Sequence, residues 1–308
     1  MNKETMDKIG LSKYLENGVI KTPDNCTKIC VDVGLSETAP NSAVWMKNDP
    51  RRCVVGIEPL EYNWGKLNGT DGTEEPSIES VDGKELEHYG TDFTAGYPAI
   101  RTKSQSVYTT VDGTGERTLI KDKFYGLQCA IDNIDTPEEK LFYHMNEEGS
   151  SSLLKPSEKH ESSIKKIEKI QCVNLNSILS HIDWEKFKFI EHLKIDCEGH
   201  DLEVIKSAED YLERIVFITY EMSTHNEGHW EGHYNFEDSK HYLTSKGFVP
   251  IRYDGGNMVC FNAKLLEESE YDFEFYRIGY IRHRGDAHTP FVINKKTSTV
   301  YYADVLFE

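Results

Sequence analysis

Four short apolar runs of the sequence each end in a carboxylate, at Asp32, Glu58, Asp196 and Glu221. In an open parallel sheet, ligands bind outside the carboxyl ends of the strands, near the point where the strand order reverses. Side chains that end such strands meet at one edge, where carboxylates can accept hydroxyl groups, take up protons or bind cations. One carboxylate at a strand end also tolerates solvent without any ligand, but four of them predict a binding edge.

The first two of these carboxylates have the surroundings of a nucleoside site. Val31-Asp32-Val33-Gly34 predicts a turn at which the backbone approaches a ligand closely. Glu58 closes the next apolar run. Its distance along the chain from the turn at Gly34 is close to that at which an acidic residue accepts both hydroxyls of a ribose. The dinucleotide pattern G-x-G-x-x-G is absent, and the loop after Gly34 carries Glu37, which disfavours a pyrophosphate. A cofactor with adenine, ribose and a zwitterionic amino-acid tail therefore fits better than a dinucleotide.

Asp196 and two histidines are the candidate catalytic groups. Activation of a hydroxyl requires a nearby base, and Asp196, His200 and His225 could each remove its proton. Asp196 is expected to end the central strand of the sheet, at the binding crevice. Glu198 either joins the same site or caps the helix that follows Gly199.

A metal site is the alternative use of the same region. Histidines recur at every fourth position after Glu221, at His225, His229 and His233. On a helix, this spacing would align them on one face as possible metal ligands. Two glycines interrupt this stretch, so a surface loop with incidental histidines is favoured, and no metal is expected. If a divalent ion does bind, Asp196 and Glu221 would be its core ligands.

Apolar runs and helical spacing alternate along the chain, which predicts an α/β fold with a parallel sheet covered by helices on both faces. The strongest strand covers residues 192–196, and helical spacing of apolar residues begins directly after it, from Leu202. Further elements are predicted as an N-terminal helix within 3–17, a small hairpin at 105–111, a strand at 140–144, a charged helix at 157–169, a short helix at 175–181, a helix at 236–246 ending at Gly247, and paired strands at 249–253 and 257–262.

The chain is expected to form one main domain with additions at both ends. Residues 1–27 are assigned to an N-terminal helical segment, residues 28–262 to the main domain, and residues 263–308 to a C-terminal extension packed on the core. Residues 65–118 are rich in Gly, Thr, Ser and acidic side chains. This composition predicts an insertion of turns, which could act as a lid.

The composition is that of a globular protein of 308 residues with a strongly acidic balance. Its 35 basic and 53 acidic residues give a net charge of −18, which disfavours nucleic acids and anionic membrane surfaces as partners. None of the seven cysteines forms a C-x-x-C pair, which favours buried free thiols and a reducing compartment. With no apolar signal core at the N-terminus, a cytoplasmic protein is expected. The oligomeric state is not specified.

Several segments resemble motifs of the FkbM methyltransferase family. The most specific is Leu193–Ala208, in which Lys-Ile-Asp-Cys-Glu-Gly-His-Asp precedes an amphipathic helix. This segment resembles the family's signature. Other segments that resemble the family, within residues 28–262, are Val31–Gly34, Gly56–Pro59, Ala130–Asn133, Gly149–Leu153 and Lys246–Phe248.

The resemblance implies a Rossmann-like fold with a seven-stranded, mostly parallel sheet. It also implies S-adenosyl-L-methionine as cofactor and methyl transfer to a hydroxyl oxygen of a sugar, glycan or small natural product. On this chain, it assigns Asp32 and Gly34 to the methionine part of the cofactor, Glu58 with Pro59 to the ribose, and Asp196 to the sulfonium and the acceptor. The residues that it assigns to the adenine are Ala130, Ile131 and Asp132.

Two features depart from the family's pattern. The loop after Gly34 lacks the second glycine often seen, and the insertion at 65–118 is long. Two other functions therefore stay open beside the methyltransferase. One is a nucleotide-sugar or NAD-binding enzyme on a similar sheet, and the other is a non-catalytic interaction module whose acidic insertion serves as the partner surface.

Overall fold

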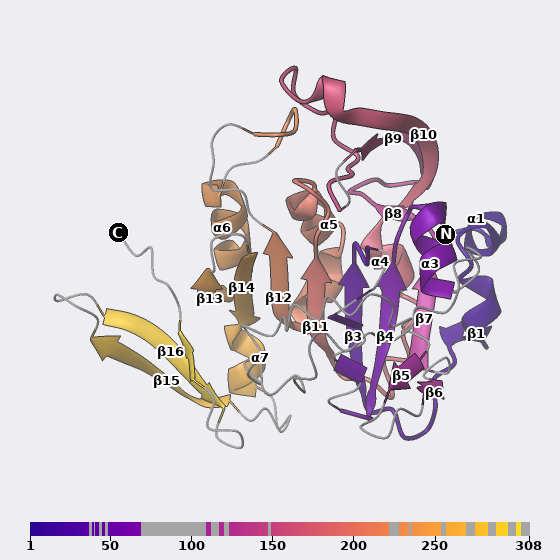
Figure 1. Ribbon diagram of the computed structural model, residues 1–308. Helices are drawn as coiled ribbons and strands as arrows, with labels where there is room; N and C mark the ends of the chain where they lie inside the picture. Colours follow the sequence, from indigo (N-terminus) through magenta and orange to yellow (C-terminus); the bar gives the residue numbers. More distant parts are fainter. Residues whose placement is uncertain are drawn as a thin grey trace, which may run out of the picture.

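A seven-stranded sheet forms the centre of the computed structural model (Figure 1). The structure describes residues 1–36, 39, 41–42, 45–46, 49–68, 109–111, 117–119, 123–146, 149–221, 228–233, 236–253, 257–268, 275–282, 288–294 and 300–302. Across the sheet, the strands follow the order β13 (Phe248–Tyr253), β14 (Asn257–Asn262), β12 (Ile215–Glu221), β11 (Ile190–Ile195), β3 (Lys28–Val33), β4 (Arg52–Ile57) and β7 (Phe124–Leu127).

Most of this sheet is parallel. The strands from β12 across to β7 all run in one direction, and β14 is antiparallel to both β12 and β13. The predicted α/β fold with a mostly parallel seven-stranded sheet is therefore confirmed. The strand order reverses at β3, because the chain places β4 and β7 on one side of β3 and returns to the other side with β11 and β12. This is the point at which open α/β sheets bind their ligands.

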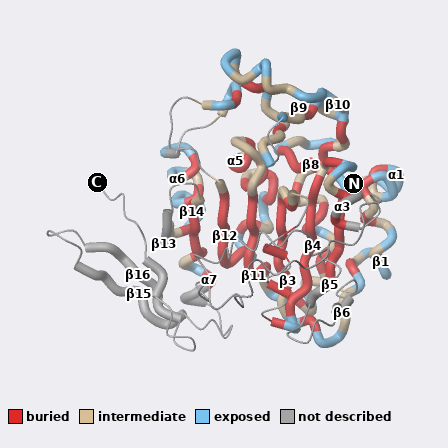
Figure 2. Tube along the Cα trace, in the orientation of Figure 1, coloured by how far each residue is buried: buried red, intermediate tan, exposed pale blue. Residues whose placement is uncertain are grey.

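Both faces of the central strands are buried. Along β3, Ile29, Val31 and Val33 belong to one buried cluster and Cys30 belongs to another. Successive strand residues point to opposite faces, so side chains cover β3 from both sides, and the sheet is red through its centre in Figure 2. The helices that contribute to the first cluster are α4 (Leu175–Leu179), α5 (Asp201–Lys206) and α6 (Phe236–Ser245), and α3 (Glu61–Asn68) contributes to the second.

A smaller three-stranded sheet lies beyond the carboxyl ends of the central strands (Figure 1). Its order is β8 (Ala130–Ile131), β10 (Ile164–Val173) and β9 (Glu138–Met145), and β9 confirms the strand predicted at 140–144. The charged helix predicted at 157–169 is wrong. Only the short 3-10 helix η3 (Glu161–Ser163) is helical there; residues 157–160 form a turn, and residues 164–169 belong to β10.

The isoleucines of β10 explain this error. Ile164, Ile167 and Ile170 are spaced three residues apart, as in a helix that buries one face. In the structure, Ile167 is 49% exposed, so the three side chains do not form one buried face. The backbone instead pairs with β9, from Ile164 opposite Met145 to Cys172 opposite Glu138. Pairing with a neighbouring strand outweighs the local helical pattern.

The segment Ala130–Ile131, which resembles a family motif, does not continue the third strand of the main sheet. The third strand, β7, ends at Leu127, and the amide of Gln128 donates to the carbonyl of Ile9 at 3.0 Å. The chain thereby leaves the main sheet. Ala130–Ile131 pairs in parallel with Cys172–Val173 of β10 in the smaller sheet.

The N-terminal helix is shorter than the helix predicted within 3–17. Helix α1 covers Lys3–Lys8, and the 3-10 helix η1 (Ser12–Tyr14) leads into a hairpin of β1 (Leu15–Glu16) and β2 (Val19–Ile20). Asn17 and Gly18 form the hairpin turn with φ angles of 53° and 86°. Asn-Gly is the pair that a two-residue turn with positive φ at both positions favours.

Several other predicted elements are confirmed. Helix α4 accounts for the short helix predicted at 175–181, and β13 with β14 forms the predicted strand pair. Helix α6 ends at Ser245, and Gly247 follows with a φ of 86°, as expected for a glycine after a helix.

Part of the insertion at 65–118 lies outside the described residues. Its described strands, β5 (Thr109–Val111) and β6 (Arg117–Leu119), pair antiparallel, and only residues 109–111 of the hairpin predicted at 105–111 lie among the described residues. The C-terminal region contains α7 (Ala263–Glu268) and an antiparallel sheet of β15 (Phe275–Arg282), β16 (His288–Asn294) and β17 (Val300–Tyr302). Within the described ranges, no helix is both long enough and apolar enough to cross a bilayer.

A buried ion pair joins two strands near their amino ends. The Nε of Arg52 in β4 donates to Oε2 of Glu191 in β11 at 2.6 Å, and Nη2 donates to Oε1 at 2.8 Å. Lys28 in β3, the strand between them, places its Nζ 3.4 Å from Oε1 of Glu191. Only 10% of the Arg52 side chain and 8% of the Glu191 side chain are exposed. Breaking such a pair leaves a buried charge without compensation.

We expect Glu191→Ala to lower the free energy of unfolding by about 3–5 kcal/mol, because Arg52 stays buried without its carboxylate. Urea denaturation followed by far-UV circular dichroism measures this change. Glu139→Ala is the matched control, since Glu139 pairs with Lys8 at the surface, where both side chains are about half exposed. Equal midpoints for both variants would contradict a stabilising role of the buried pair.

Candidate active site

The predicted carboxylates come together at the carboxyl edge of the main sheet. Asp32 lies one residue before the end of β3, Glu58 and Asp196 directly follow β4 and β11, and Glu221 is the last residue of β12. In the strand register, Asp32 lies opposite Gly56 on one side and opposite Lys194 on the other. The adjacent parallel strands therefore bring these side chains to one edge, next to the reversal of strand order at β3.

Gly34 allows the turn after β3 to touch the end of β11. Its φ is +80°, and a Cβ atom at this position would lie 1.9 Å from the carbonyl oxygen of Asp196. The amide of Asp196 also donates to the carbonyl of Val33 at 3.0 Å. The close approach predicted at Gly34 is therefore an approach to the protein's own backbone, and any larger residue here would separate the two strand ends.

Lys194 connects the groups at this edge. Its Nζ donates to the carbonyl oxygen of Gly34 at 2.7 Å and lies 3.3 Å from Oδ2 of Asp196 and 3.7 Å from Oδ1 of Asp32. Only 6% of the Lys194 side chain is exposed. Sequence reasoning missed this residue, although Lys194 stands two positions before Asp196 and so lies on the same face of the strand.

Asp32 is completely buried. Its Oδ2 accepts hydrogen bonds from the amide and the hydroxyl of Ser42, at 3.2 and 2.6 Å. Its Oδ1 has no hydrogen-bond donor among the residues that the structure describes. Burial raises the pKa of Asp32, although Lys194 and Ser42 oppose that effect. A hydrogen-bond donor that reached Oδ1 would therefore be strongly favoured.

Glu58 is also covered, and protein donors surround it. Its Oε1 accepts from the amide of Leu60 at 3.0 Å, and Asn63 and the amide of Ser36 donate to the same carboxyl group. Burial raises the pKa of Glu58 to about 7, although these hydrogen bonds lower it. Pro59 next to it is partly exposed. Hydroxyl groups of a ligand would have to replace some of these donors.

Three carboxyl groups gather beside Lys194. Asp196, Glu198 and Glu221 each offer an oxygen, and these oxygens all lie within 4.8 Å of one another. We call this group the carboxyl cluster. The Asp196 side chain is 41% exposed. Glu198 has a positive φ of 51° in the turn after β11, and its carboxyl group lies with those of Asp196 and Glu221.

Glu198 and Glu221 in the carboxyl cluster retain their protons near neutral pH. Burial and then the neighbouring carboxylates raise the pKa of Glu221 to about 8 and that of Glu198 to about 9. A side-chain hydrogen bond joins Glu221 to Asp196. Chemically, an ionised carboxylate in this cluster can accept the proton of a bound hydroxyl or hold a cation.

His200 and Asp132 pair with each other. Nε2 of His200 lies 2.8 Å from Oδ1 of Asp132, and Lys140 donates to Oδ2 of Asp132 at 2.5 Å. Burial opposes ionisation of Asp132, but the bonds from His200 and Lys140 outweigh it and hold the pKa of Asp132 well below its usual range. His200 is not a member of the carboxyl cluster. Its contacts position the start of α5, which argues against the base role predicted for it.

The remaining predicted residues that the structure describes are not members of the carboxyl cluster. Ala130 and Ile131 are buried, Ala130 in a cluster with Phe142 and Ile131 in the main core. His225 lies outside the described residues. His229 packs edge-on against His160, with ring centroids 4.4 Å apart. Among the described residues, no histidine takes part in a group with the spacing of metal ligands.

We expect the stability of Glu221→Gln relative to wild type to increase as pH rises. The folded protein keeps the proton of Glu221 up to about pH 8, whereas the unfolded chain releases it near the usual value of 4.5. The carboxyl group therefore destabilises the wild-type protein increasingly between these two values. In thermal melts with EDTA, the difference in melting temperature between variant and wild type should grow by roughly 3 °C or more from pH 5 to pH 8.

Glu185→Gln is the control for this pH dependence, because Glu185 is exposed and precedes the amino end of β11, whereas the carboxyl cluster lies at the carboxyl end. Its melting temperature should follow that of the wild type at every pH. A constant difference between Glu221→Gln and wild type would contradict a protonated carboxyl group at this site.

The part of the chain that matches a protein-family model contains this edge of the sheet. A model of the methyltransferase FkbM domain matches residues 32–250, which include Asp32, Glu58 and the whole carboxyl cluster. Comparisons with curated proteins and with solved structures gave no match. The match covers more than half of the chain and contains the point where the strand order reverses. The chain therefore belongs to the FkbM methyltransferase family.

Proposed function

We propose that this methyltransferase uses S-adenosyl-L-methionine to methylate a hydroxyl group of a sugar, glycan or small natural product. The observation that carries the proposal is the carboxyl cluster, whose Asp196 is 41% exposed and stands beside the reversal of strand order at β3. An exposed carboxylate at this edge can take up the proton that a hydroxyl must lose. The family implies S-adenosyl-L-methionine as the cofactor.

The residues at the edge fit such a cofactor in charge and in hydrogen bonding. The buried Oδ1 of Asp32, which lacks a donor among the described residues, would accept the cofactor's ammonium group. Glu58 would accept ribose hydroxyls once they replace part of its present donors. Asp132 is already held by His200 and Lys140, so its part in the adenine site would be to fix the backbone of Ala130 and Ile131.

The cofactor, when bound, supplies a methyl group on a cationic sulfonium. The protein's own contribution is to align the acceptor and remove its proton. Asp196 would accept that proton, while Glu221, protonated at neutral pH, donates to Asp196 and keeps it in place. Lys194 would hold Asp196 in position through its contact at 3.3 Å and through the carbonyl of Gly34.

Several other expectations belong to the same proposal. Helices on both faces of the sheet are supported by Leu243 of α6 and Trp64 of α3, which lie in different buried clusters. A cytoplasmic location is supported by the seven free cysteines, which suit a reducing compartment. A small-molecule or carbohydrate acceptor, rather than a nucleic acid or a membrane, is supported by the net charge of −18.

Titration calorimetry decides between the candidate functions. We expect S-adenosylhomocysteine to bind and NAD not to bind. Asp32→Asn and Glu58→Gln should each weaken S-adenosylhomocysteine at least about tenfold, because each removes a charged acceptor. Glu185→Gln serves as the exposed control. Binding of NAD alone would favour the dinucleotide enzyme, and unchanged affinity in both site variants would favour the non-catalytic module.

Asp196→Asn should separate proton removal from cofactor binding. In an assay of S-adenosylhomocysteine formation with a panel of methyl glycosides, we expect this variant to be about 100-fold slower or more, as for the loss of a general base. Its affinity for S-adenosylhomocysteine should change little, since Asp32 and Glu58 remain. Undiminished activity would contradict the role of Asp196.

The same assay tests the alternative that Asp196 and Glu221 hold a divalent ion. If the ion is required, wild-type protein dialysed against EDTA loses activity and Mg²⁺ restores it. Full activity after dialysis contradicts the ion and leaves the role of Asp196 as a base unchanged.

A further inference from the structure

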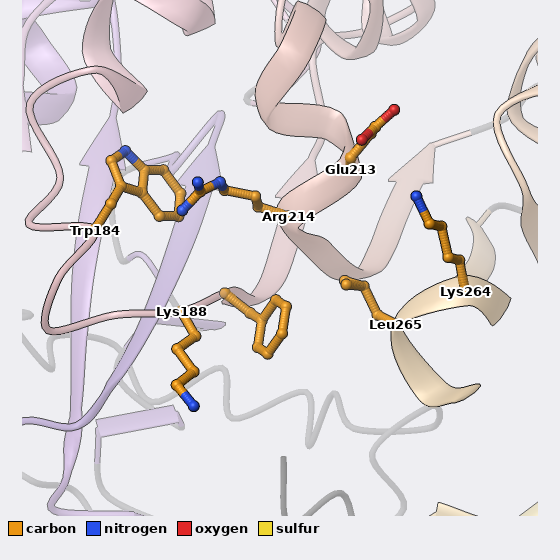
Figure 3. Close-up of a pocket in the computed structure, with 7 residues that line it drawn as sticks. Trp184, Lys188, Glu213, Arg214, Lys264 and Leu265 are labelled. Atoms are coloured by element: carbon orange, nitrogen blue, oxygen red, sulfur yellow. The ribbon is translucent and has the colours of Figure 1, made fainter. Parts of the chain in front are cut away.

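A pocket of about 350 Å³ lies at the opposite edge of the sheet from the carboxyl cluster. It adjoins the amino ends of β11 and β12, the two strands whose other ends carry Asp196 and Glu221. Figure 3 shows its lining, which includes Trp184, Lys188, Phe189, Arg214, Lys264 and Leu265. This volume suits a small molecule.

An aromatic stack holds Arg214 at this pocket. The rings of Tyr211 and Trp184 lie 5.0 Å apart with an angle of 11° between their planes, which is a stacked arrangement. The guanidinium carbon of Arg214 lies 4.7 Å from the centre of the Trp184 ring, and Figure 3 shows the Arg214 side chain reaching toward that ring. Trp184 is itself fixed, because its Nε1 donates to the carbonyl of Leu179 at 3.0 Å. The stack therefore restricts the guanidinium before any ligand arrives.

The donors of Arg214 are available. Within the part of the chain that the structure describes, the Arg214 guanidinium makes a ring contact but no hydrogen bond or ion pair, and Lys188 has neither. Both residues are exposed. Three cations and a single carboxylate, Glu213, line the pocket. This positive excess stands out in a chain with a net charge of −18.

The pocket also offers an apolar surface. Phe189 is partly buried, and Leu265 of α7 is 7% exposed. A bare inorganic ion would make no apolar contact with these side chains. A ligand with both an anionic group and an apolar body would use the whole lining.

We propose that this pocket binds a small organic anion. The guanidinium of Arg214 holds its carboxylate or phosphate with two parallel hydrogen bonds, as the planar fork of arginine favours. Lys188 adds positive charge, and the apolar body of the ligand lies against Phe189 and Leu265. The site is separate from the methyl-transfer edge, so the proposal does not depend on the proposed function.

The indole resonances of ¹⁵N-labelled tryptophan test this proposal on the full chain. The chain has four tryptophans, and Trp184→Phe identifies the signal of Trp184 by its disappearance. We expect phenyl phosphate and benzoate to shift the Trp184 signal in a saturable way and to leave the other three in place. Benzamide, which has the same body without the charge, should give no saturable shift.

Variants of Arg214 separate the binding of the anion from the stacking of the guanidinium on Trp184. Arg214→Gln should weaken the binding of phenyl phosphate at least tenfold, and Arg214→Lys, which keeps the charge but loses the fork, should lie between it and wild type. Lys165→Gln removes one exposed positive charge from β10 and should bind as wild type does. The dispersion of the other indole signals reports that each variant is folded.

Three results would overturn the proposal. The first is the absence of a saturable shift with either anion, in which case the stack only stabilises the fold. The second is equal binding by Arg214→Gln and wild type. The third is binding of inorganic phosphate as tightly as phenyl phosphate, which would remove the role of the apolar body.

Discussion

The ammonium group of Lys194 is the interaction on which the candidate site depends. It lies almost fully buried between the carbonyl of Gly34 and the carboxylates of Asp32 and Asp196, which come from the ends of two neighbouring strands. Acidic groups so close together repel one another where water does not screen them. One buried cation between them, and a glycine that lets the backbones touch, allow both strand ends to present carboxylates at a single edge.

The two edges of the sheet use charge in opposite ways. Near the amino ends, Arg52, Lys28 and Glu191 combine opposite charges, and the pair of Arg52 with Glu191 satisfies both buried groups. At the carboxyl edge, Glu198 and Glu221 stand near Asp196 with pKa values raised by burial and by neighbouring carboxylates. The first arrangement stabilises the fold, whereas the second reduces stability as pH rises. Such a local cost is expected where side chains are arranged for chemistry.

Local patterns in the sequence predicted much of the main sheet but failed where distant strands pair. The apolar runs that end at Asp32, Glu58, Asp196 and Glu221 are buried on both faces, and such runs are typical of parallel strands. Ile164, Ile167 and Ile170 carry a helical spacing, yet β10 forms because β9 offers it a partner. The end of β7 at Leu127 likewise depends on a contact with Ile9, over a hundred residues earlier. The spacing of residues within a short segment does not specify the distant segment with which that segment pairs.

The sequence by itself determined the parallel sheet, the four carboxylates at its strand ends and the resemblance to the FkbM family, because strand periodicity and motif spacing are local properties of the chain. Only the tertiary structure decided which side chains share the site. It brought Glu198 and Lys194 to Asp196 and Glu221, and it paired His200 with Asp132 instead. The physical reason is that strand register and turn geometry set distances between residues far apart in sequence. A polar side chain pairs with whichever group burial leaves beside it.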